Sequence, residues 1–448
     1  MSLHNHFKIV DPVSVGTVRF APLAAAGQPC GKILLLQGPV GPFFGDLERH
    51  LTEQGYGVTR TYFNAGDRVF GRSGGAHVLV AGGLDAWRRW LKAKLAVGAF
   101  DCIILFGAER PAHIVARAVA KDHGVQVIAL EEGYIRSGLI TIEAEGNNAF
   151  SPIAGRLPPS DWVPSAPVEQ TVFKDSLPRM VVYGAVYYAM RSVFSRRAQA
   201  ETFHRNAPLL AEAGAWMRNF GRWAVNCRAE RRKISSLIAK SAGRFYLVPL
   251  QVAVDSNLGV SALGWNSHRL IERSLRSFAK TAPQDTKLVF KIHPMERGHS
   301  NLKPKITALA AALGVAERVL VFETGSLGEL TKYSAGMITI NSSSGLSAIH
   351  HGVPLLVIGR AIYAHPALAT CASGYPDFDG FWRDGHCADV AQRRNYLLWL
   401  KALALRPGDF YGKRGRAEAC QSIAQALEMP LAQSATLGHF MQVLRKAP

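Results

Sequence analysis

The chain has 448 residues, of which 48% are hydrophobic and 19% are charged. This length favours two domains over one, and this composition can form large buried cores, which excludes a wholly disordered chain. The formal net charge of +19 indicates an anionic partner. Because no zinc-finger, RNA-recognition or basic-zipper pattern occurs, we expect phosphate-bearing substrates and an anionic membrane surface, and no nucleic acid.

The first third of the chain alternates short apolar runs with segments of helical periodicity. We expect strands at 32–37, 58–63, 101–106 and 125–130, and helices at 43–54 and 111–123. Strands and helices that alternate at this spacing form a doubly wound, mostly parallel sheet. We therefore predict a Rossmann-like domain over residues 1–170, in which residues 151–170, with five prolines, form a linker or an irregular wall of a cleft.

The middle of the chain, residues 171–240, is dense in arginine, aromatic and methionine residues. Its pattern predicts helices over about 176–240. Amphipathic helices that pack on the domains would have this composition, and so would a basic, aromatic surface that rests on a membrane interface. The two interpretations are compatible, and both stay open at this point.

A second alternation begins at residue 245. We expect strands at 245–250, 287–292, 319–322, 336–340 and 354–358, with helices at 268–281, at 302–313 and after residue 345. This pattern predicts a second Rossmann-like domain over residues 241–390. Residues 391–448 are expected to form C-terminal helices, and a return of this tail to the first domain stays open. The predicted fold class is α/β, with two doubly wound domains that face a cleft.

Polar residues follow several of the predicted strands. Ligands of open parallel sheets bind beyond the carboxyl ends of the strands, so such residues are candidates for a common site in the cleft. They are Glu131 and Glu132, Gln251 with Asp255, His293 with Pro294, and the run Asn341, Ser342, Ser343, Ser344 and Gly345.

The run from Asn341 to Gly345 is a candidate phosphate site, because hydroxyls and backbone N–H groups at the start of a helix bind anions. Ordinary serine capping of the helix would give the same pattern. His293, in a loop that Pro294 stiffens, can donate to a phosphate or a leaving oxygen, or it can be a solvent-facing loop residue. Lys291 has the same side-chain parity, although we expect this lysine to extend towards solvent. No Walker loop occurs, so ATP hydrolysis is not indicated.

The carboxylates near the predicted strand ends suit glycosyl transfer. Asp255 can be a nucleophile, a base or a helix cap. Glu131 and Glu132 are adjacent on a strand, where side chains alternate, so we expect one of them to face the cleft. Transfer with retention needs one carboxylate nucleophile and a second acid/base group close by, and these residues meet that requirement.

Neither a metal site nor secretion is indicated by the sequence. The six cysteines are scattered, and the histidines lack metal-ligand spacing, so we predict reduced thiols and no metal. We find no secretory signal and no apolar run of the roughly 18 residues that a membrane-spanning helix needs, so we expect the protein in the cytoplasm.

The same segments carry a resemblance to a known family. In chain order over about residues 30–370 they are LLLQGPVGPFF, FNAGDRVF, LEEGYIRSGLITIE, VPLQVAVDSN, KIHPMERG and INSSSGLSAIHHGVPLLVIGRAIYAHPAL. They resemble the capsule polysaccharide biosynthesis and export proteins of the KpsS/LipB type. The resemblance implies a GT-B arrangement of the two domains, with the acceptor on the first and the nucleotide sugar on the second. It also implies a retaining β-Kdo glycosyltransferase that moves Kdo from CMP-Kdo to a lyso- or phosphatidylglycerol anchor, with no cofactor beyond this substrate.

The family's functional residues carry over by motif. Asp255 in LQVAVD matches the aspartate that we take as the candidate nucleophile. Glu131 or Glu132 in EEGY is implied to be the acid/base that faces the acceptor. The residues implied to bind the donor are Gln251, His293, Pro294, Asn341, Ser342, Ser343, Ser344 and Gly345, with His293 and the serines at the phosphate and ribose of CMP.

The chain departs from the family pattern at Ser137, where proline is common, and at 256–258 and 363–368. These departures concern the identity of the acceptor and of the sugar. Another nonulosonic acid could take the place of Kdo as the sugar. We expect peripheral binding to the inner face of the inner membrane, and contacts with the capsule assembly and export machinery. Two other functions stay open: a sugar-nucleotide epimerase, which would need no acceptor, and a non-enzymatic adaptor of an export complex, which would not bind CMP.

Overall fold

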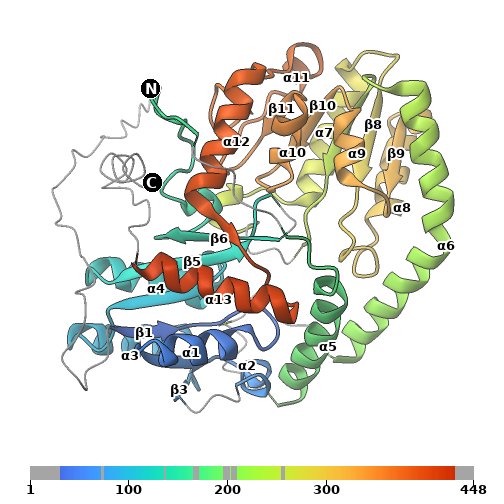
Figure 1. The fold of residues 1–448 in the computed structure, drawn as a ribbon. Helices are drawn as coiled ribbons and strands as arrows, with labels where there is room; N and C mark the ends of the chain where they lie inside the picture. The colour runs from blue at the N-terminus through green and yellow to red at the C-terminus, as the bar shows by residue number, and fades with distance from the viewer. Residues whose placement is uncertain are drawn as a thin grey trace, which may run out of the picture.

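Two β-sheets, each covered by helices, form the framework of the protein (Figure 1). The computed structural model describes residues 31–71, 75–135, 138–164, 171–194, 202, 209–253 and 258–428. The predicted nucleophile Asp255 and the family departure at Ser137 lie outside these residues, as do both ends of the chain.

The first sheet has seven strands in the order β13-β6-β5-β4-β1-β2-β3. The strands expected from the sequence are confirmed, with ends that shift by at most two residues. The parallel strands are β1 (Lys32–Leu35), β2 (Gly57–Tyr62), β3 (Ala76–Leu79), β4 (Cys102–Phe106) and β5 (Gln126–Glu132), and β6 (Leu139–Ala144) runs antiparallel to β5.

Sequence patterns did not predict β3 or β6. Strand β3 lies at the edge of the sheet and is mostly exposed, so it lacks the apolar run of a buried strand. Strand β6 is fully buried, but it follows β5 closely and reverses direction, so the alternation of strand and helix gives no signal for it.

Helices cover both faces of the first sheet, as a doubly wound domain requires. They are α1 (Phe43–Glu53), α2 (Ala65–Val69), α3 (Leu84–Ala96) and α4 (Pro111–Asp122). Successive residues of β1 point to opposite faces: Ile33 packs in the core that includes α1, while Leu34 packs in the core that includes α3 and α4. Both side chains are completely buried, so neither face of the strand meets solvent.

The second sheet has six parallel strands in the order β12-β11-β10-β7-β8-β9, and the strands expected here are also confirmed. They are β7 (Phe245–Pro249), β8 (Lys287–Lys291), β9 (Val319–Phe322), β10 (Gly336–Thr339), β11 (Leu355–Val357) and the unpredicted two-residue β12 (Thr370–Cys371). The helices are α7 (Ser267–Thr281), α8 (Leu302–Ala312), α9 (Leu327–Lys332), α10 (Gly345–His351) and α11 (Phe378–Asp384). The strand order reverses between β7 and β10, which is where such sheets bind ligands.

Two long helices connect the domains and lie along one side of the molecule (Figure 1). Helix α5 (Ser176–Phe194) packs on α2 of the first domain, and α6 (Leu209–Ser241) runs along the second. Both were expected as helices. Of the helices in the described ranges, none has the length and apolarity needed to cross a bilayer.

The C-terminal tail returns to the first domain, which answers the question that the sequence left open. Helix α12 (Val390–Ala404) packs beside α10, and α13 (Lys413–Glu428) packs on α1. Between them the expected helical tail contains a strand, β13 (Leu405–Pro407), which pairs antiparallel with β6. The tail therefore completes the first sheet and ties the second domain to it.

Phe410, just after β13, anchors this return. Its ring is buried and makes edge contacts with Phe43 and Phe106, at centroid distances of 4.8 and 5.1 Å. We expect Phe410→Ala to destabilise the protein by about 3–5 kcal/mol and to lower its thermal midpoint by several degrees. Tyr375→Ala, at a tyrosine that is 90% exposed, is the control and should leave the midpoint unchanged. Equal midpoints for the two variants would show that the tail contributes little to stability.

Candidate functional site

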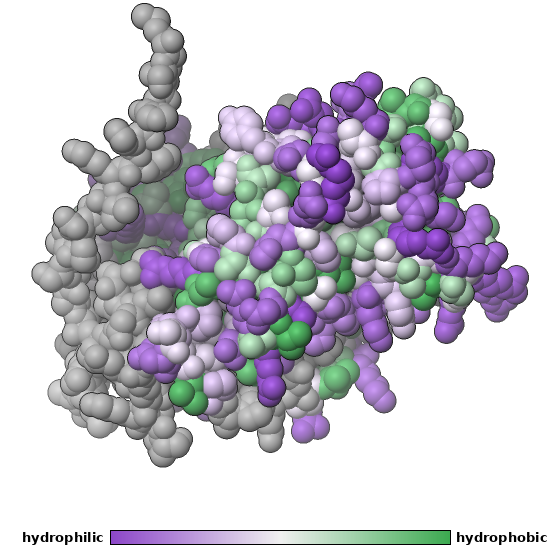
Figure 2. All heavy atoms as spheres, turned by 90° about the horizontal axis from the view of Figure 1, so that it is seen from above, coloured by the Kyte–Doolittle hydropathy of each residue, from purple (hydrophilic) through white to green (hydrophobic). Residues whose placement is uncertain are grey.

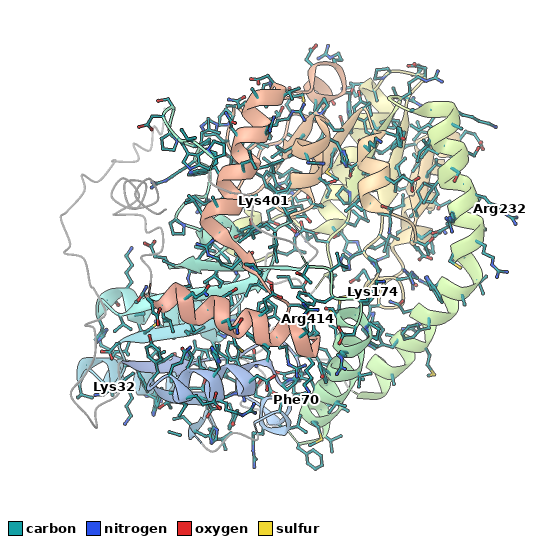
Figure 3. All side chains as sticks on the ribbon, viewed as in Figure 1. Lys32, Phe70, Lys174, Arg232, Lys401 and Arg414 are labelled. Atoms are coloured by element: carbon teal, nitrogen blue, oxygen red, sulfur yellow. The ribbon has the colours of Figure 1, made fainter. Side chains whose placement is uncertain are left out.

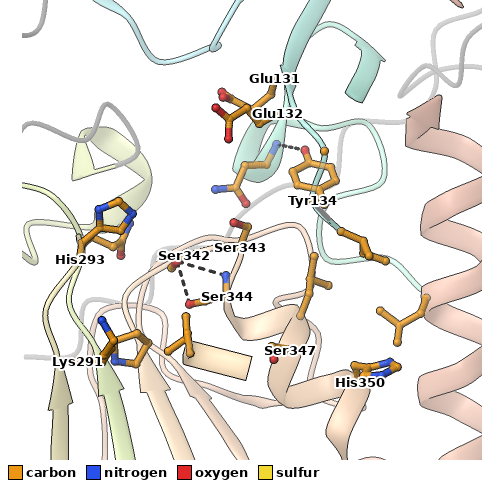
Figure 4. A pocket seen from close by; sticks show the side chains of 18 of the residues that line it. Glu131, Glu132, Tyr134, Lys291, His293, Ser342, Ser343, Ser344, Ser347 and His350 are labelled. Carbon is orange, nitrogen blue, oxygen red and sulfur yellow. Dashed lines mark hydrogen bonds between the residues drawn. The ribbon is translucent and has the colours of Figure 1, made fainter. Parts of the chain in front are cut away.

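A cavity of about 1130 Å³ lies between the two domains, beyond the carboxyl ends of strands from both sheets (Figure 4). Strands β5, β7 and β8, the turn before α10 and one face of α12 contribute to its walls. Most of the residues that the sequence singled out line this cavity: Glu131, Glu132, Gln251, His293, Pro294, Ser342, Ser343 and Ser344. Asn341 and Gly345 are buried next to the lining residues.

Both glutamates of the pair border the cavity, so the expectation that only one would do so is wrong. They are the last two residues of β5, at the carboxyl-terminal end of this inner strand. Successive side chains of a strand point to opposite faces of the sheet. A cleft beyond the end of the strand can be reached from either face, so both glutamates can border it. Their partners differ: Asn147 donates to Glu131 Oε2 at 3.5 Å, and the Tyr411 hydroxyl donates to Glu132 Oε1 at 3.3 Å.

The serine turn, residues 342–344, leads from β10 into α10. Ser342 Oγ accepts hydrogen bonds from the backbone N and the Oγ of Ser344, at 3.2 and 2.9 Å. Ser344 occupies the N-cap position, but its own side chain makes no capping bond. Gly345 is required by packing, because a Cβ there would lie 2.3 Å from the Tyr363 ring.

Gln251 and Asn341 form a buried amide pair at the point where the second sheet reverses. Gln251 Nε2 donates to Asn341 Oδ1 at 3.0 Å, and the Asn341 backbone N donates back to Gln251 Oε1 at 3.4 Å. The Asn341 side chain also donates to Ser261 Oγ, which in turn donates to Glu109 of the first domain at 2.5 Å. The pair therefore belongs to a polar network that joins the two domains.

A second branch of this network passes through Tyr134, which lines the cavity. Its hydroxyl, labelled in Figure 4, accepts from the Asn148 backbone N at 2.5 Å. The same hydroxyl donates to Glu143 at 2.6 Å. The Asn148 side chain contacts the second domain, donating to Asn341 O and accepting from Ile362 N. Burial raises the pKa of Glu143 to about 7.

Sequence reasoning missed the residues that join the domains. Glu109 follows β4, so the strand-end rule that selected Glu131 could have found it. Asn148 has a φ of 51°, a left-handed conformation that asparagine tolerates better than most residues. Ser261 carries no local signal, because it lies in a short 3₁₀ turn far from any strand end.

The second domain supplies cationic and imidazole groups to the cavity. Lys291 is only 4% exposed, so the expectation that it extends towards solvent is wrong. Its Nζ donates to Ile292 O at 3.0 Å, and burial, assisted by nearby Arg297, lowers its pKa to about 8. His293 Nδ1 accepts from Met295 N at 3.2 Å, which favours the tautomer with a proton on Nε2.

Helix α12 adds a face that the sequence reasoning did not use. Its cavity-lining residues recur at helical spacing, so the periodicity of the sequence could have predicted that these residues share one face of the helix. They are Val390, Arg393, Arg394, Leu397, Leu398 and Lys401.

The two walls of the cavity thus differ in character. The first domain contributes carboxylates, and the second contributes basic groups, hydroxyls and a helix start. Such a site can bind an anion on one wall and present a carboxylate as a general base from the other. Among the described residues, no cluster of three or more His, Cys, Asp or Glu side chains could hold a metal ion.

Comparisons with known proteins point to capsule assembly. The family model described as "Capsule polysaccharide biosynthesis protein" matches residues 101–410. The capsule polysaccharide export protein KpsS of Escherichia coli is 33% identical over 340 residues, which cover 74% of this chain and 85% of KpsS. The capsule polysaccharide modification protein LipB of Neisseria meningitidis serogroup A is 32% identical over 400 residues, which cover 85% of this chain and 92% of LipB.

A solved structure, the beta Kdo 2,7 transferase KpsC of Thermosulfurimonas dismutans, matches 88% of this chain and 99% of its own. The two are 12% identical, with a TM-score of 0.39. A TM-score this low does not establish a shared fold, and the fold class rests on the strand orders of the two sheets.

Lys291 gives a test of the anion-binding wall. Because its pKa of about 8 lies below the ordinary 10.5, the folded protein disfavours the charged form. Lys291→Met should therefore raise the thermal midpoint at pH 7, while it weakens binding of CMP about tenfold or more, as loss of a charged hydrogen bond would. Lys287→Met, on the same strand, is the control for CMP binding.

The pH dependence follows from the same pKa. Between pH 8 and 10 the unfolded chain binds more protons than the folded one, so the wild type gains stability relative to Lys291→Met as the pH rises. Wild-type affinity for CMP should fall over the same range, as measured by calorimetry. CMP affinity that is equal in wild type and Lys291→Met would exclude Lys291 from the anion-binding wall.

Proposed function

The chain belongs to the capsule polysaccharide biosynthesis protein family, and on that premise we propose that it is a retaining glycosyltransferase which moves Kdo from CMP-Kdo to a phosphatidylglycerol-type lipid anchor. The resemblance of its motifs to the KpsS/LipB type suggests this donor and acceptor. One observation carries the proposal: a single cavity between two doubly wound domains has carboxylates on one wall and basic groups with hydroxyls on the other.

The basic wall suits a donor of this kind. CMP-Kdo has a phosphate and a sugar carboxylate, so it carries two anionic groups close together. Lys291, Arg393, Arg394 and His293 line the cavity, and we assign them to binding these anionic groups. The serine turn offers hydroxyls to the phosphate or ribose, in line with the role implied for Ser342, Ser343 and Ser344. Gln251 and Asn341 act in this proposal by positioning that turn.

The proposed reaction has two displacements. Asp255 attacks the anomeric carbon of Kdo, and CMP leaves as a phosphate monoester whose charge the basic wall stabilises. Glu131 or Glu132 then takes the proton of the acceptor hydroxyl, and the resulting oxygen attacks the same carbon and releases Asp255. Two inversions give net retention. Because CMP leaves as a stabilised anion, the scheme needs no cofactor or metal ion.

A lipid acceptor would place the protein at the inner face of the inner membrane, where capsule assembly and export proteins could receive the product. The basic charge of the chain supports this location, because lysine and arginine near an anionic leaflet contribute on the order of 1 kcal/mol each.

The direct test is transfer from CMP-Kdo to a fluorescent phosphatidylglycerol analogue, with the product analysed by mass spectrometry and NMR. We expect one added Kdo in the β configuration. An α product would overturn the retaining mechanism. Absence of product together with normal CMP binding would overturn the choice of donor or acceptor, and absence of both would favour an adaptor of the export complex.

Substitutions of the three carboxylates separate their roles. Asp255→Asn should abolish transfer and leave CMP affinity unchanged within about twofold, because it removes the nucleophile and not the basic wall. Of Glu131→Gln and Glu132→Gln, the one that removes the acid/base should slow transfer by about 10²–10⁴. That variant should also accumulate a covalent Kdo adduct, visible in the intact-protein mass, since the second displacement is blocked.

Glu317→Gln, at an exposed position far from the cavity, is the matched control and should behave as wild type. Full activity of Asp255→Asn would remove Asp255 from the mechanism. If both glutamate variants kept full activity, the acid/base would have to be sought elsewhere.

A further inference from the structure

Helices α5 and α6 expose an unusual number of apolar side chains. We call this surface the α5–α6 face. On α6 the apolar residues lie in its first half, and some are more than two-thirds exposed, such as Met217 at 71% and Val225 at 78%. The exposed apolar residues of the face are Leu177, Val181, Val182, Val186, Val193 and Phe194 on α5, and Met217, Phe220, Trp223 and Val225 on α6.

The second half of α6 is basic. Residues 225–241 contain five lysines and arginines and one acidic residue, Glu230. Glu230 is buried, so it does not offset this charge on the outer face. Arg232 points away from the body of the molecule (Figure 3), and hydrophilic residues form the right-hand rim in Figure 2, on the side of α6. The exposed basic residues of this half are Arg228, Arg231, Arg232, Lys233 and Lys240.

The opposite side of α6 contacts the cavity wall. Asn219 Nδ2 donates to Pro294 O at 2.7 Å, and Arg222 donates to Arg297 O at 2.6 Å. Farther along, Glu230 accepts from the backbone N of Thr324 at 2.8 Å and from Lys303 at 3.0 Å. One helix therefore separates the α5–α6 face from the loop that carries His293.

We infer that the α5–α6 face is the surface by which this protein binds an anionic lipid bilayer. On α6 an apolar first half is followed by a basic second half, and a membrane interface likewise joins acyl chains to anionic headgroups. The charges are complementary, because the outer face of α6 has basic residues and no exposed acidic one among residues 213–241. The inference deepens the proposed function, on whose lipid acceptor it rests, and it assigns a surface and a partner that the cavity does not reveal.

Docking through this face would bring the site close to its acceptor. The apolar first half of α6 would reach the acyl chains beneath the headgroups, and the Asn219 and Arg222 contacts would hold the His293 loop directly behind it. A lipid headgroup would then need to travel only past one helix to reach the cavity.

The test is co-sedimentation of the full chain with vesicles of phosphatidylcholine, with and without phosphatidylglycerol. The wild type should bind the anionic vesicles, and added salt should weaken binding. The double variant Arg231→Glu, Arg232→Glu should bind about tenfold more weakly or worse, because it replaces two basic residues near the anionic leaflet with acidic ones. Val225→Glu should reduce the binding that persists in high salt, since it places a charge among the acyl chains.

The controls lie on α3 and at Val97, the residue that follows it. Helix α3 is on the opposite side of the molecule from α6 (Figure 1). Arg88→Glu with Arg89→Glu matches the charge change, and Val97→Glu matches Val225→Glu because Val97 is 77% exposed. Both controls should bind vesicles as the wild type does. Equal losses in the α3 and α6 variants would overturn the inference, because binding would then follow net charge and not this face.

Two further outcomes are decisive. If the wild type did not bind anionic vesicles, the inference would be overturned, and a protein partner would be the occupant of the face. CMP affinity, measured on the same preparations, should be unchanged in every α6 variant. Vesicle binding without Kdo transfer would refute the proposed function and leave the docking surface standing, which keeps the two failures distinguishable.

Discussion

The buried polar network between the two domains is the constraint on which the site depends. Glu109, Ser261 and Asn341 form one continuous path from the first domain to the second, and Tyr134 and Asn148 form another. A buried polar group that loses its partner costs about 1–3 kcal/mol, so these contacts favour one relative position of the domains. Because both paths meet at Asn341, the residue before the serine turn, the domain junction also sets the position of that turn.

The network explains why polar residues at strand ends serve two purposes. Gln251 and Asn341 satisfy each other and are mostly hidden, so they position the turn before α10. Glu131, Glu132 and the serines face the cavity itself. A functional site needs both kinds of residue. The residues that face the ligand can be held in one orientation only if buried residues behind them support them.

Ionisable groups in and beside the cavity are buried at an energetic cost. Burial lowers the pKa of the lining residue Lys291 and raises that of Glu143, which contacts the lining residue Tyr134, so the fold disfavours the ionised form of each group. Groups whose pKa is strongly perturbed at a cleft are candidates for function. The C-terminal tail both lines the cavity and stabilises the fold. Helix α12 forms one wall of the cavity, and Phe410 and α13 complete the core of the first domain, which offsets part of this cost.

The sequence by itself determined the strands and helices with strong periodicity, the two-domain class and a set of polar residues that line the cavity, because these follow from local patterns and from the rule that ligands bind at strand ends. It did not determine that the tail pairs with β6, that Lys291 is buried, or that Glu109 meets Ser261 across the domain junction. Those facts depend on how segments that are distant in the sequence pack together. Only the tertiary structure decides such contacts, because no local spacing encodes the angle at which the domains meet or the path by which α12 crosses between them.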